Sequence, residues 1–342
     1  MKPPAAHDDV VAAVINYNTA ALTLRCVGSL LDAGVSAVLV LDNASAAEDY
    51  RQLEAGPARE AQGVRVIRSE ENLGFAQGCN YLIDEALRDA RCARVILVNS
   101  DAVVEPAGLA ACLHRMGEGR HDLMGGRMLK PAGSLGGTEA VDSLGIALYK
   151  CLLASNRMSV EDAYLGPTGG FAVYSRRFLE DVRSIHGYVF DPSYFCYAED
   201  TDLCVRARLL AASVGYVDEV VARHEGQAST TGGYSDFILY HGIRNSIWMA
   251  AKSIPGRVLL RHLPWLVLLH GGIVLRHLLQ GHWKTLWRLY RDALAGLPRV
   301  RVERARVQAT RRITPREFEA FVDRQFYEPR FLHGATRDLF SR

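Results

Sequence analysis

The sequence predicts an α/β fold in which a mostly parallel sheet is flanked by helices on both faces. Two observations support this class: strand-length apolar runs alternate with segments of helical spacing, and the runs at 10–15, 37–41 and 95–98 are continuous. Strands buried on both faces have this character, whereas a strand with one solvated face alternates polar and apolar residues. A third observation, a basic and partly apolar C-terminal segment, predicts a helical extension after the sheet.

The expected elements follow in order along the chain. Strands are expected at residues 10–15, 37–41, 64–67, 95–98, 171–174 and 216–221. Helical spacing of apolar residues predicts helices at 19–33 and 80–89 between the early strands. The stretch from Gly125 to Tyr174 is richer in glycine and less periodic.

The composition of the chain limits the classes of protein to which it can belong. The chain has 342 residues, 49% of them hydrophobic, which is ample for a buried core. Its seven cysteines form no CxxC pair, which favours reduced thiols in a cytoplasmic setting and argues against zinc. The N-terminal residues lack the apolar core of a secretory signal.

The small net charge of +2 hides an asymmetry. Residues 257–342 contain 17 Lys and Arg and 7 Asp and Glu, a net charge of +10, so the remainder carries −8. A basic tail favours contact with a nucleic acid or an anionic membrane surface. The alternative is a solvated helical surface.

The segment 258–291 suits a membrane surface best. Leu263 to Leu279 is apolar but marginal for a spanning helix, and Trp283 and Trp287 follow it among Lys and Arg residues. This pattern predicts an interfacial helix, and the spread of the basic residues argues against nucleic acid. The alternative is an amphipathic helix packed against the rest of the chain or a second subunit.

Polar side chains follow the buried strands, where ligands bind in parallel sheets. Asp42 could accept a hydrogen bond from a ribose hydroxyl or a base N–H, although taken in isolation a helix-cap or turn role is favoured. Gly74 and Gly78 stand at a helix entrance, which indicates either phosphate binding or a tight turn. Asp101 could hold Mg²⁺ or Mn²⁺ with His224 as a second ligand, although a lone His is commonly structural.

Three carboxylates lie within four residues at Glu199, Asp200 and Asp202, directly after a run of aromatics. A carboxyl group beside bulky apolar side chains has a raised pKa, which suits general base catalysis. The alternative is the first turn of a helix, where acidic residues are favoured.

Taken in order, these segments resemble the family 2 glycosyltransferases, particularly the bacterial rhamnosyltransferase-like branch. The resemblance covers roughly residues 10–255. The matching pieces are residues 14–18, 41–43, 71–80, 97–101, 169–170, 190–206, 224 and 240–245. The family's Asp-x-Asp appears here as Asn99-Ser-Asp101.

The resemblance implies a GT-A fold over residues 1–255, a separate extension over 256–342, and an inverting transfer from a nucleotide-sugar. It implies that Asp200 is the base and that Glu199 beside it shapes the acceptor site. It also implies that Gly169 and Gly170 let the acceptor approach closely. The implied cofactor is a divalent cation, Mg²⁺ or Mn²⁺, at Asp101 and His224. The implied donor-binding residues are Asn16, Asn18, Asp42, Asn43, Gly74, Phe75, Gly78 and Asn99.

The resemblance also implies the partners. The donor is a dTDP- or UDP-sugar, with L-rhamnose as the first candidate, and the acceptor is a cell-surface polysaccharide or a polyprenyl-linked glycan. We expect a cytoplasmic protein, peripheral on the inner face of the plasma membrane, that binds no nucleic acid. A nucleotidyltransferase would carry a basic, glycine-rich loop near its first strand. A catalytically degenerate scaffold docked through its basic tail would need neither Asp101 nor Asp200.

Overall fold

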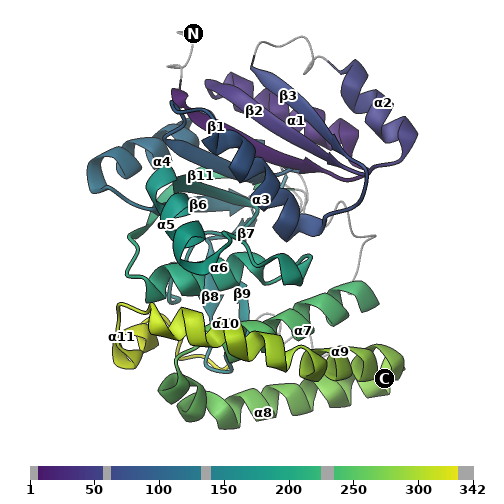
Figure 1. Ribbon diagram of the computed structural model, residues 1–342, viewed down its shortest axis with the longest axis vertical. Coiled ribbons are helices and arrows are strands. Elements are labelled where there is room, and N and C mark those ends of the chain that lie inside the picture. The colour runs from purple at the N-terminus through teal and green to yellow at the C-terminus, as the bar shows by residue number, and fades with distance from the viewer. Residues whose placement is uncertain (1–6, 57–62, 132–139, 225–234, 330–342) are drawn as a thin grey trace. The chain divides into compact units, whose positions relative to one another are not determined.

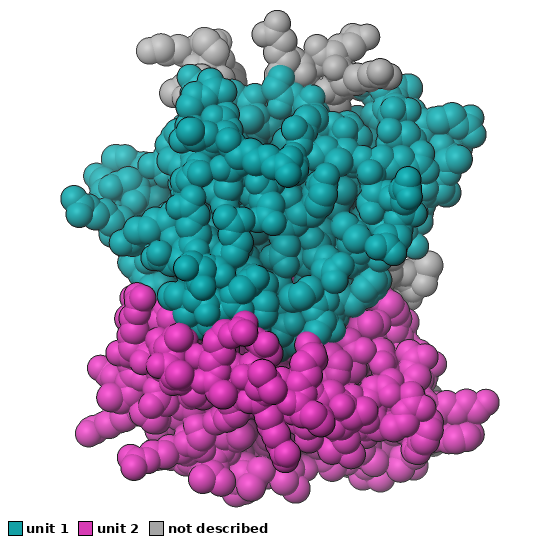
Figure 2. Space-filling view, in the orientation of Figure 1, with its two compact units in different colours: residues 1–145, 166–196, 212–233 teal, residues 146–165, 197–211, 234–342 magenta. Residues whose placement is uncertain are grey.

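The computed structural model describes residues 7–56, 63–131, 140–224 and 235–329 (Figure 1). The chain forms two compact units, coloured separately in Figure 2. Unit 1 comprises Met1–Gly145, Gly166–Cys196 and Ala212–Gly233, and unit 2 comprises Ile146–Leu165, Tyr197–Ala211 and Tyr234–Arg342.

Unit 1 is built on a nine-stranded sheet with the order β3-β2-β1-β4-β10-β6-β11-β5, with β7 paired to β6. The first four strands are mutually parallel, β10 runs antiparallel to β4 and β6, and β5 runs antiparallel to β11. The strands are β1 (His7–Asn16), β2 (Val35–Asn43), β3 (Val64–Ser69), β4 (Arg94–Asn99), β5 (Ala102–Val104), β6 (Leu123–Leu129), β7 (Val141–Ser143), β10 (Phe171–Ser175) and β11 (Val214–His224).

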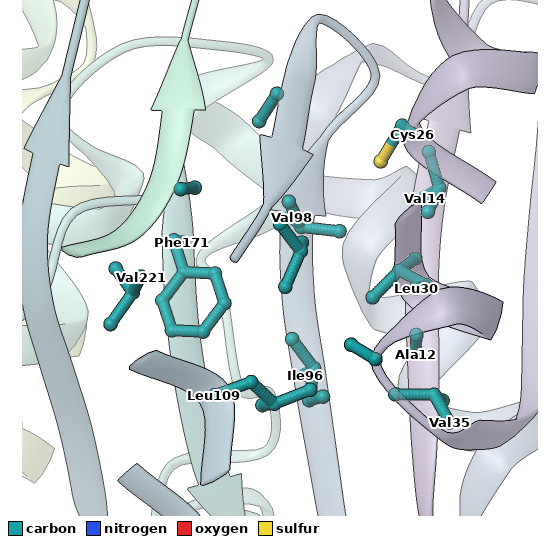
Figure 3. Close-up of a cluster of buried hydrophobic side chains, with 14 of the residues drawn as sticks. Ala12, Val14, Cys26, Leu30, Val35, Ile96, Val98, Leu109, Phe171 and Val221 are labelled. Atoms are coloured by element: carbon teal, nitrogen blue, oxygen red, sulfur yellow. The ribbon is translucent and has the colours of Figure 1, made fainter. Parts of the chain in front are cut away.

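Helices cover both faces of this sheet, which confirms the predicted fold class. Ala12 and Val14 of β1 share a core with Cys26 and Leu30 of α1 (Figure 3). On the other face Gly78 of α3 packs against the side chain of Ile15 of β1. The helices of unit 1 are α1 (Ala20–Asp32), α2 (Ala47–Ala55), α3 (Gly74–Leu87), α4 (Pro106–Gly119), α5 (Arg176–His186) and the short 3₁₀ helix η2 (Pro192–Tyr194).

The helix α3 begins earlier than the predicted start at Asn80. Its first turn forms because the amide N–H groups of Phe75 and Ala76 donate to the carbonyl oxygen of Phe195, at 2.6 and 3.1 Å. That acceptor lies far along the sequence, so the spacing of apolar residues did not show that the helix entrance at Gly74 and Gly78 belongs to the helix itself.

Unit 2 is mainly helical, and the predicted C-terminal helices are present. Leu239 and Ile243 of α7 pack against Leu286 and Leu289 of α9. The helix α8 begins at Gly256, and the predicted division after residue 255 stays a prediction. The elements are β8 (Ile146–Leu148), β9 (Ala154–Asn156), α6 (Glu199–Leu209), α7 (Asp236–Ser253), α8 (Gly256–Leu279), α9 (Trp283–Ala295), α10 (Leu297–Ala309) and α11 (Pro315–Glu319).

Candidate functional site

Asn16 organises the ends of β1 and β2. Its side chain is fully buried, and its Oδ1 accepts a hydrogen bond of 2.7 Å from the Thr23 hydroxyl. Its Nδ2 lies 2.9 Å from Asp42 Oδ1, 3.0 Å from Ser45 Oγ and 2.8 Å from Asp49 Oδ2. Because both polar atoms are engaged within the protein, Asn16 orients Asp42 in this structure.

One of the two carboxylate oxygens of Asp42 is available to a ligand. The side chain is buried, and its Oδ2 accepts no hydrogen bond from the described residues. The Arg68 Nε lies 3.7 Å from this oxygen, and the Arg68 guanidinium lies 4.0 Å from the centroid of the Tyr50 ring. A buried acceptor without a donor is costly, so this oxygen is suited to an N–H or O–H of a ligand.

Asn18 and Asn43 hold the loops beside this carboxylate. Asn18 has a left-handed φ of 56°, and its Oδ1 accepts from the Ala46 amide at 2.8 Å. Asn43 Oδ1 accepts from the Leu73 amide at 2.9 Å, and its Nδ2 donates to Asn72 Oδ1 at 2.9 Å. Sequence reasoning placed both residues at the site, and the structure shows how they shape it.

The entrance of α3 favours the tight-turn interpretation over phosphate binding. The amide N–H groups of Phe75 and Ala76 are engaged by Phe195, and the Gly74 amide donates to Asn72 Oδ1 at 2.8 Å. Gly74 has a φ of +72°, and a Cβ there would lie 2.6 Å from the Phe195 carbonyl oxygen. These N–H groups therefore serve the loop itself.

Asp101 and His224 are brought together by strand pairing. His224 pairs with Ala102 of β5, and its Nε2 lies 3.1 Å from Asp101 Oδ1 and 3.2 Å from Asn99 Nδ2. Its Nδ1 lies 2.9 Å from Asp142 Oδ2. Asp101 and His224 are therefore adjacent, and Asp142 is a third residue of this cluster, which the sequence did not reveal.

The charges around His224 suit a cation. Burial by itself lowers the pKa of His224, but hydrogen bonds to Asp101 and Asp142 outweigh it and raise the pKa to about 10. Nowhere in the described ranges do three or more His, Cys, Asp or Glu side chains form a metal-binding group. Two protein ligands still fit Mg²⁺ or Mn²⁺, which take further ligands from phosphate and water.

Gly169 and Gly170 are buried beside this cluster. The carbonyl oxygen of Gly170 accepts from the Asn99 amide at 3.2 Å. A Cβ on Gly170 would lie 3.0 Å from the Met128 Cε, so close packing accounts for glycine there. Their acceptor-side role stays a prediction.

The acidic segment of unit 2 follows a strained turn. Tyr197 and Ala198 both have a φ of 66°, which is costly for residues with a side chain and is concentrated at functional sites. Asn245 Nδ2 donates to the Tyr197 carbonyl oxygen at 2.8 Å, and Asn245 Oδ1 accepts two hydrogen bonds from Arg244. The 240–245 segment of the resemblance therefore supports this turn.

The three carboxylates of α6 have different surroundings. Asp200 Oδ1 accepts from the Thr201 amide at 2.6 Å. Glu199 is buried, and its Oε2 accepts no hydrogen bond from the described residues. Burial, and then the nearby charge of Asp200, raises the pKa of Glu199 well above its ordinary value.

Asp202 has a structural environment. It is fully buried and accepts hydrogen bonds from Arg206 Nε at 2.8 Å, Lys252 Nζ at 3.0 Å and Ser253 Oγ at 2.8 Å. These contacts join α6 to α7. Residues 199–202 therefore form the first turn of a helix, as one interpretation predicted. They also include a desolvated carboxyl group, that of Glu199, as the other interpretation predicted.

The model of glycosyl transferase family 2 matches residues 12–183, half of the chain. The chain belongs to glycosyl transferase family 2. This glycosyltransferase carries Asp42, Asp101 and both glycines of the 74–78 loop within the matched range. No curated protein matches the sequence.

Solved GT-A structures share the fold of this glycosyltransferase. S. aureus TarS 1-349 in complex with UDP-GlcNAc is 16% identical, with a TM-score of 0.53 over 92% of this chain and 89% of that one. GalNAc-T7 with UDP, GalNAc and Mn²⁺ is 12% identical, with a TM-score of 0.52 over 75% of this chain. The match covers 49% of the GalNAc-T7 chain, about half its length. At these identities the likeness shows the fold.

Proposed function

We propose that this glycosyltransferase transfers a sugar, with L-rhamnose as the first candidate, from a dTDP- or UDP-linked donor to a hydroxyl group with inversion. The observation that most supports this donor is the buried Asp42 Oδ2, which accepts no hydrogen bond from the described residues and lies beside Arg68. Thymine and uracil both carry an imide N–H that this oxygen would accept. The UDP and UDP-GlcNAc in the related structures support this class of donor.

A divalent cation, Mg²⁺ or Mn²⁺, would be held by Asp101 and His224. When bound, it would act as a Lewis acid that neutralises charge on the leaving diphosphate. Asp142 would accept a hydrogen bond from His224 Nδ1–H and fix the orientation of the ring, so that Nε2, which faces Asp101, would bind the cation after losing its proton.

Asp200 is the proposed base. The acceptor oxygen forms a bond to the anomeric carbon, the bond from that carbon to the diphosphate oxygen breaks, and the hydroxyl proton passes to the Asp200 carboxylate. A single displacement of this kind inverts the anomeric centre and needs one base on the acceptor side. The strained turn before α6 supports a functional role for this segment.

The proposed acceptor is a cell-surface polysaccharide or a polyprenyl-linked glycan. The basic character of residues 257–342 supports work at the inner face of the plasma membrane, where an anionic surface attracts Lys and Arg. Residues 256–342 would then attach the enzyme where such acceptors are found.

Donor binding by thermal shift tests the proposal. We expect one dTDP- or UDP-sugar to raise the melting temperature in the presence of Mn²⁺, and GDP-sugars to have no effect. Ligand at 100 times its Kd stabilises a protein by about 2.7 kcal/mol. The variant Asp42→Ala should lose the shift. No shift with any donor would favour the catalytically degenerate scaffold instead.

A further inference from the structure

The outward face of α8 is apolar over most of its length. Leu260 is 72% exposed and Leu275 is 59% exposed. Leu260, Val267, Leu268, Leu275, Leu278 and Leu279 are all exposed and share one helical stripe. A surface helix of a soluble domain turns such a stripe inward, and exposed apolar surface of this extent marks an interaction site.

The neighbouring helix α9 borders this stripe with tryptophans and cations. Trp287 is 62% exposed, and the Arg291 guanidinium lies 4.7 Å from the centroid of its ring. Lys284 Nζ lies 5.6 Å from the centroid of the exposed Trp283 ring. The helices α8 and α9 pack side by side (Figure 1). Tryptophan with Lys and Arg at the edge of an apolar face is typical of the boundary between lipid and water.

The inward side of α8 contacts other elements of unit 2 along the helix. His262 Nδ1 donates to the Lys150 carbonyl oxygen at 2.7 Å, and His270 Nδ1 lies 2.9 Å from the Tyr290 hydroxyl oxygen. In the described part of the chain, α8 is the one helix with the length and composition to cross a membrane. Crossing would separate it from these partners, so the contacts favour a helix that lies along a surface.

We propose that the outward stripe of α8 and the tryptophan edge of α9 bind an anionic lipid bilayer, with α8 parallel to the membrane plane. The stripe enters the upper acyl region, and Lys284, Arg288 and Arg291 lie among the headgroups. This inference names the surface for the membrane attachment proposed above and does not depend on which sugar is transferred.

Charge selects the bilayer over a second copy of the chain. The helices α8 to α10 contain ten Lys and Arg residues and two acidic residues, a net charge of +8. Pairing this face with itself would bring two such charges together, and like charges across an interface are unfavourable. An anionic bilayer neutralises them.

Vesicle flotation of the full chain tests the proposal. We expect flotation with vesicles of phosphatidylcholine and phosphatidylglycerol, weaker flotation with phosphatidylcholine only, and release by high salt. Leu275→Glu should weaken partitioning by about 10- to 100-fold, the range for losing the burial of one Leu side chain. Leu268→Glu should act likewise. The matched control is Val160→Glu, since Val160 is 55% exposed and lies outside α8 and α9.

Four outcomes would overturn the proposal. They are full flotation of Leu275→Glu, equal flotation with neutral and anionic vesicles, retention on the membrane after alkaline carbonate extraction, and a lipid-free dimer that Leu275→Glu separates. The third indicates a spanning helix and the fourth a second copy. Donor binding in the thermal-shift assay is read separately, so failure of attachment and failure of the proposed transfer are distinguishable.

Discussion

Glu199 and Asp200 are adjacent carboxylates of α6 with different surroundings. Glu199 is buried with a raised pKa, whereas Asp200 is partly exposed. At neutral pH a base must be ionised and reach the acceptor hydroxyl. Of the pair, Asp200 therefore suits proton abstraction better, and Glu199 suits shaping the acceptor side.

Replacing Asp200 separates chemistry from binding. We expect Asp200→Asn to lower kcat by about 10²- to 10⁴-fold, the range for loss of a general base, because the amide cannot take the proton. The donor-induced thermal shift should stay unchanged. Single-turnover sugar transfer and thermal shift measure the two effects. Loss of donor binding in this variant would contradict the assignment.

Glu199 makes stability depend on pH. Since its pKa is raised in the folded protein, the folded state holds a proton that the unfolded state has released above about pH 4.5. Stability therefore falls as pH rises above that value, by at most about 1.4 kcal/mol per pH unit. Glu199→Gln should remove this contribution. Urea unfolding between pH 5 and 8 checks it, and identical slopes for both proteins would refute it.

In the proposed cation site, Asp142 would act through His224. Its carboxylate fixes the proton on Nδ1, and loss of such an orienting partner typically weakens a metal site by about 10- to 100-fold. Asp142→Asn should therefore raise the Mn²⁺ concentration needed for the donor-induced thermal shift, and Asp142→Glu should restore part of it. An unchanged Mn²⁺ requirement would show that Asp142 only supports the fold.

At the scale of elements, α6 is held by a buried ionic cluster. Asp202 accepts from Arg206 and Lys252, all three of them almost fully buried. Asp202→Asn leaves two buried cations without their carboxylate, which costs about 3–5 kcal/mol. Urea unfolding measures the loss. Breaking the exposed pair of Glu48 and Arg51 by Glu48→Gln is the control, and it should change stability by less than about 1 kcal/mol.

The sequence predicted the first half of the sheet better than the second. β1, β2 and β4 are buried on both faces, so their apolar runs are continuous and visible in one segment. The insertion of β10 between β4 and β6 depends on pairing between distant segments. Such pairing leaves no local signal, so β10 was predicted as a strand but not as an antiparallel one, and the short antiparallel strands β5 and β7 were missed.

The candidate site, like the sheet, was predicted from the sequence only in part. Asp101 and His224 were predicted together from their positions after strands and again through the resemblance, but the pairing of β5 with β11 that unites them leaves no local signal. Asp142 stands on the three-residue strand β7, which is too short to show periodicity. Arg68 follows the apolar run of β3 directly, and its place at the strand end was the signal that could have revealed it.

At the scale of the whole molecule, the chain passes five times between its two compact units. Segments 146–165 and 197–211 belong to unit 2 although they lie inside the expected catalytic region. The helix α7 also belongs to unit 2, where its apolar side packs on α9. This arrangement bears on the predicted extension after residue 255, because α7 precedes that point and its partners follow it.

A chain ending at residue 255 tests that division. It would expose Leu239, Ile243 and Trp248, and each such side chain contributes about 1.5–3 kcal/mol when buried. Against a total stability of about 5–15 kcal/mol, we expect the fragment to aggregate or to unfold without cooperativity. Soluble yield and urea unfolding measure this. Full-length Leu275→Glu is the control, because it alters the exposed stripe and leaves the α7–α9 core intact. A soluble fragment that unfolds cooperatively and binds donor would show instead that residues 256–342 are a separable attachment to the catalytic domain.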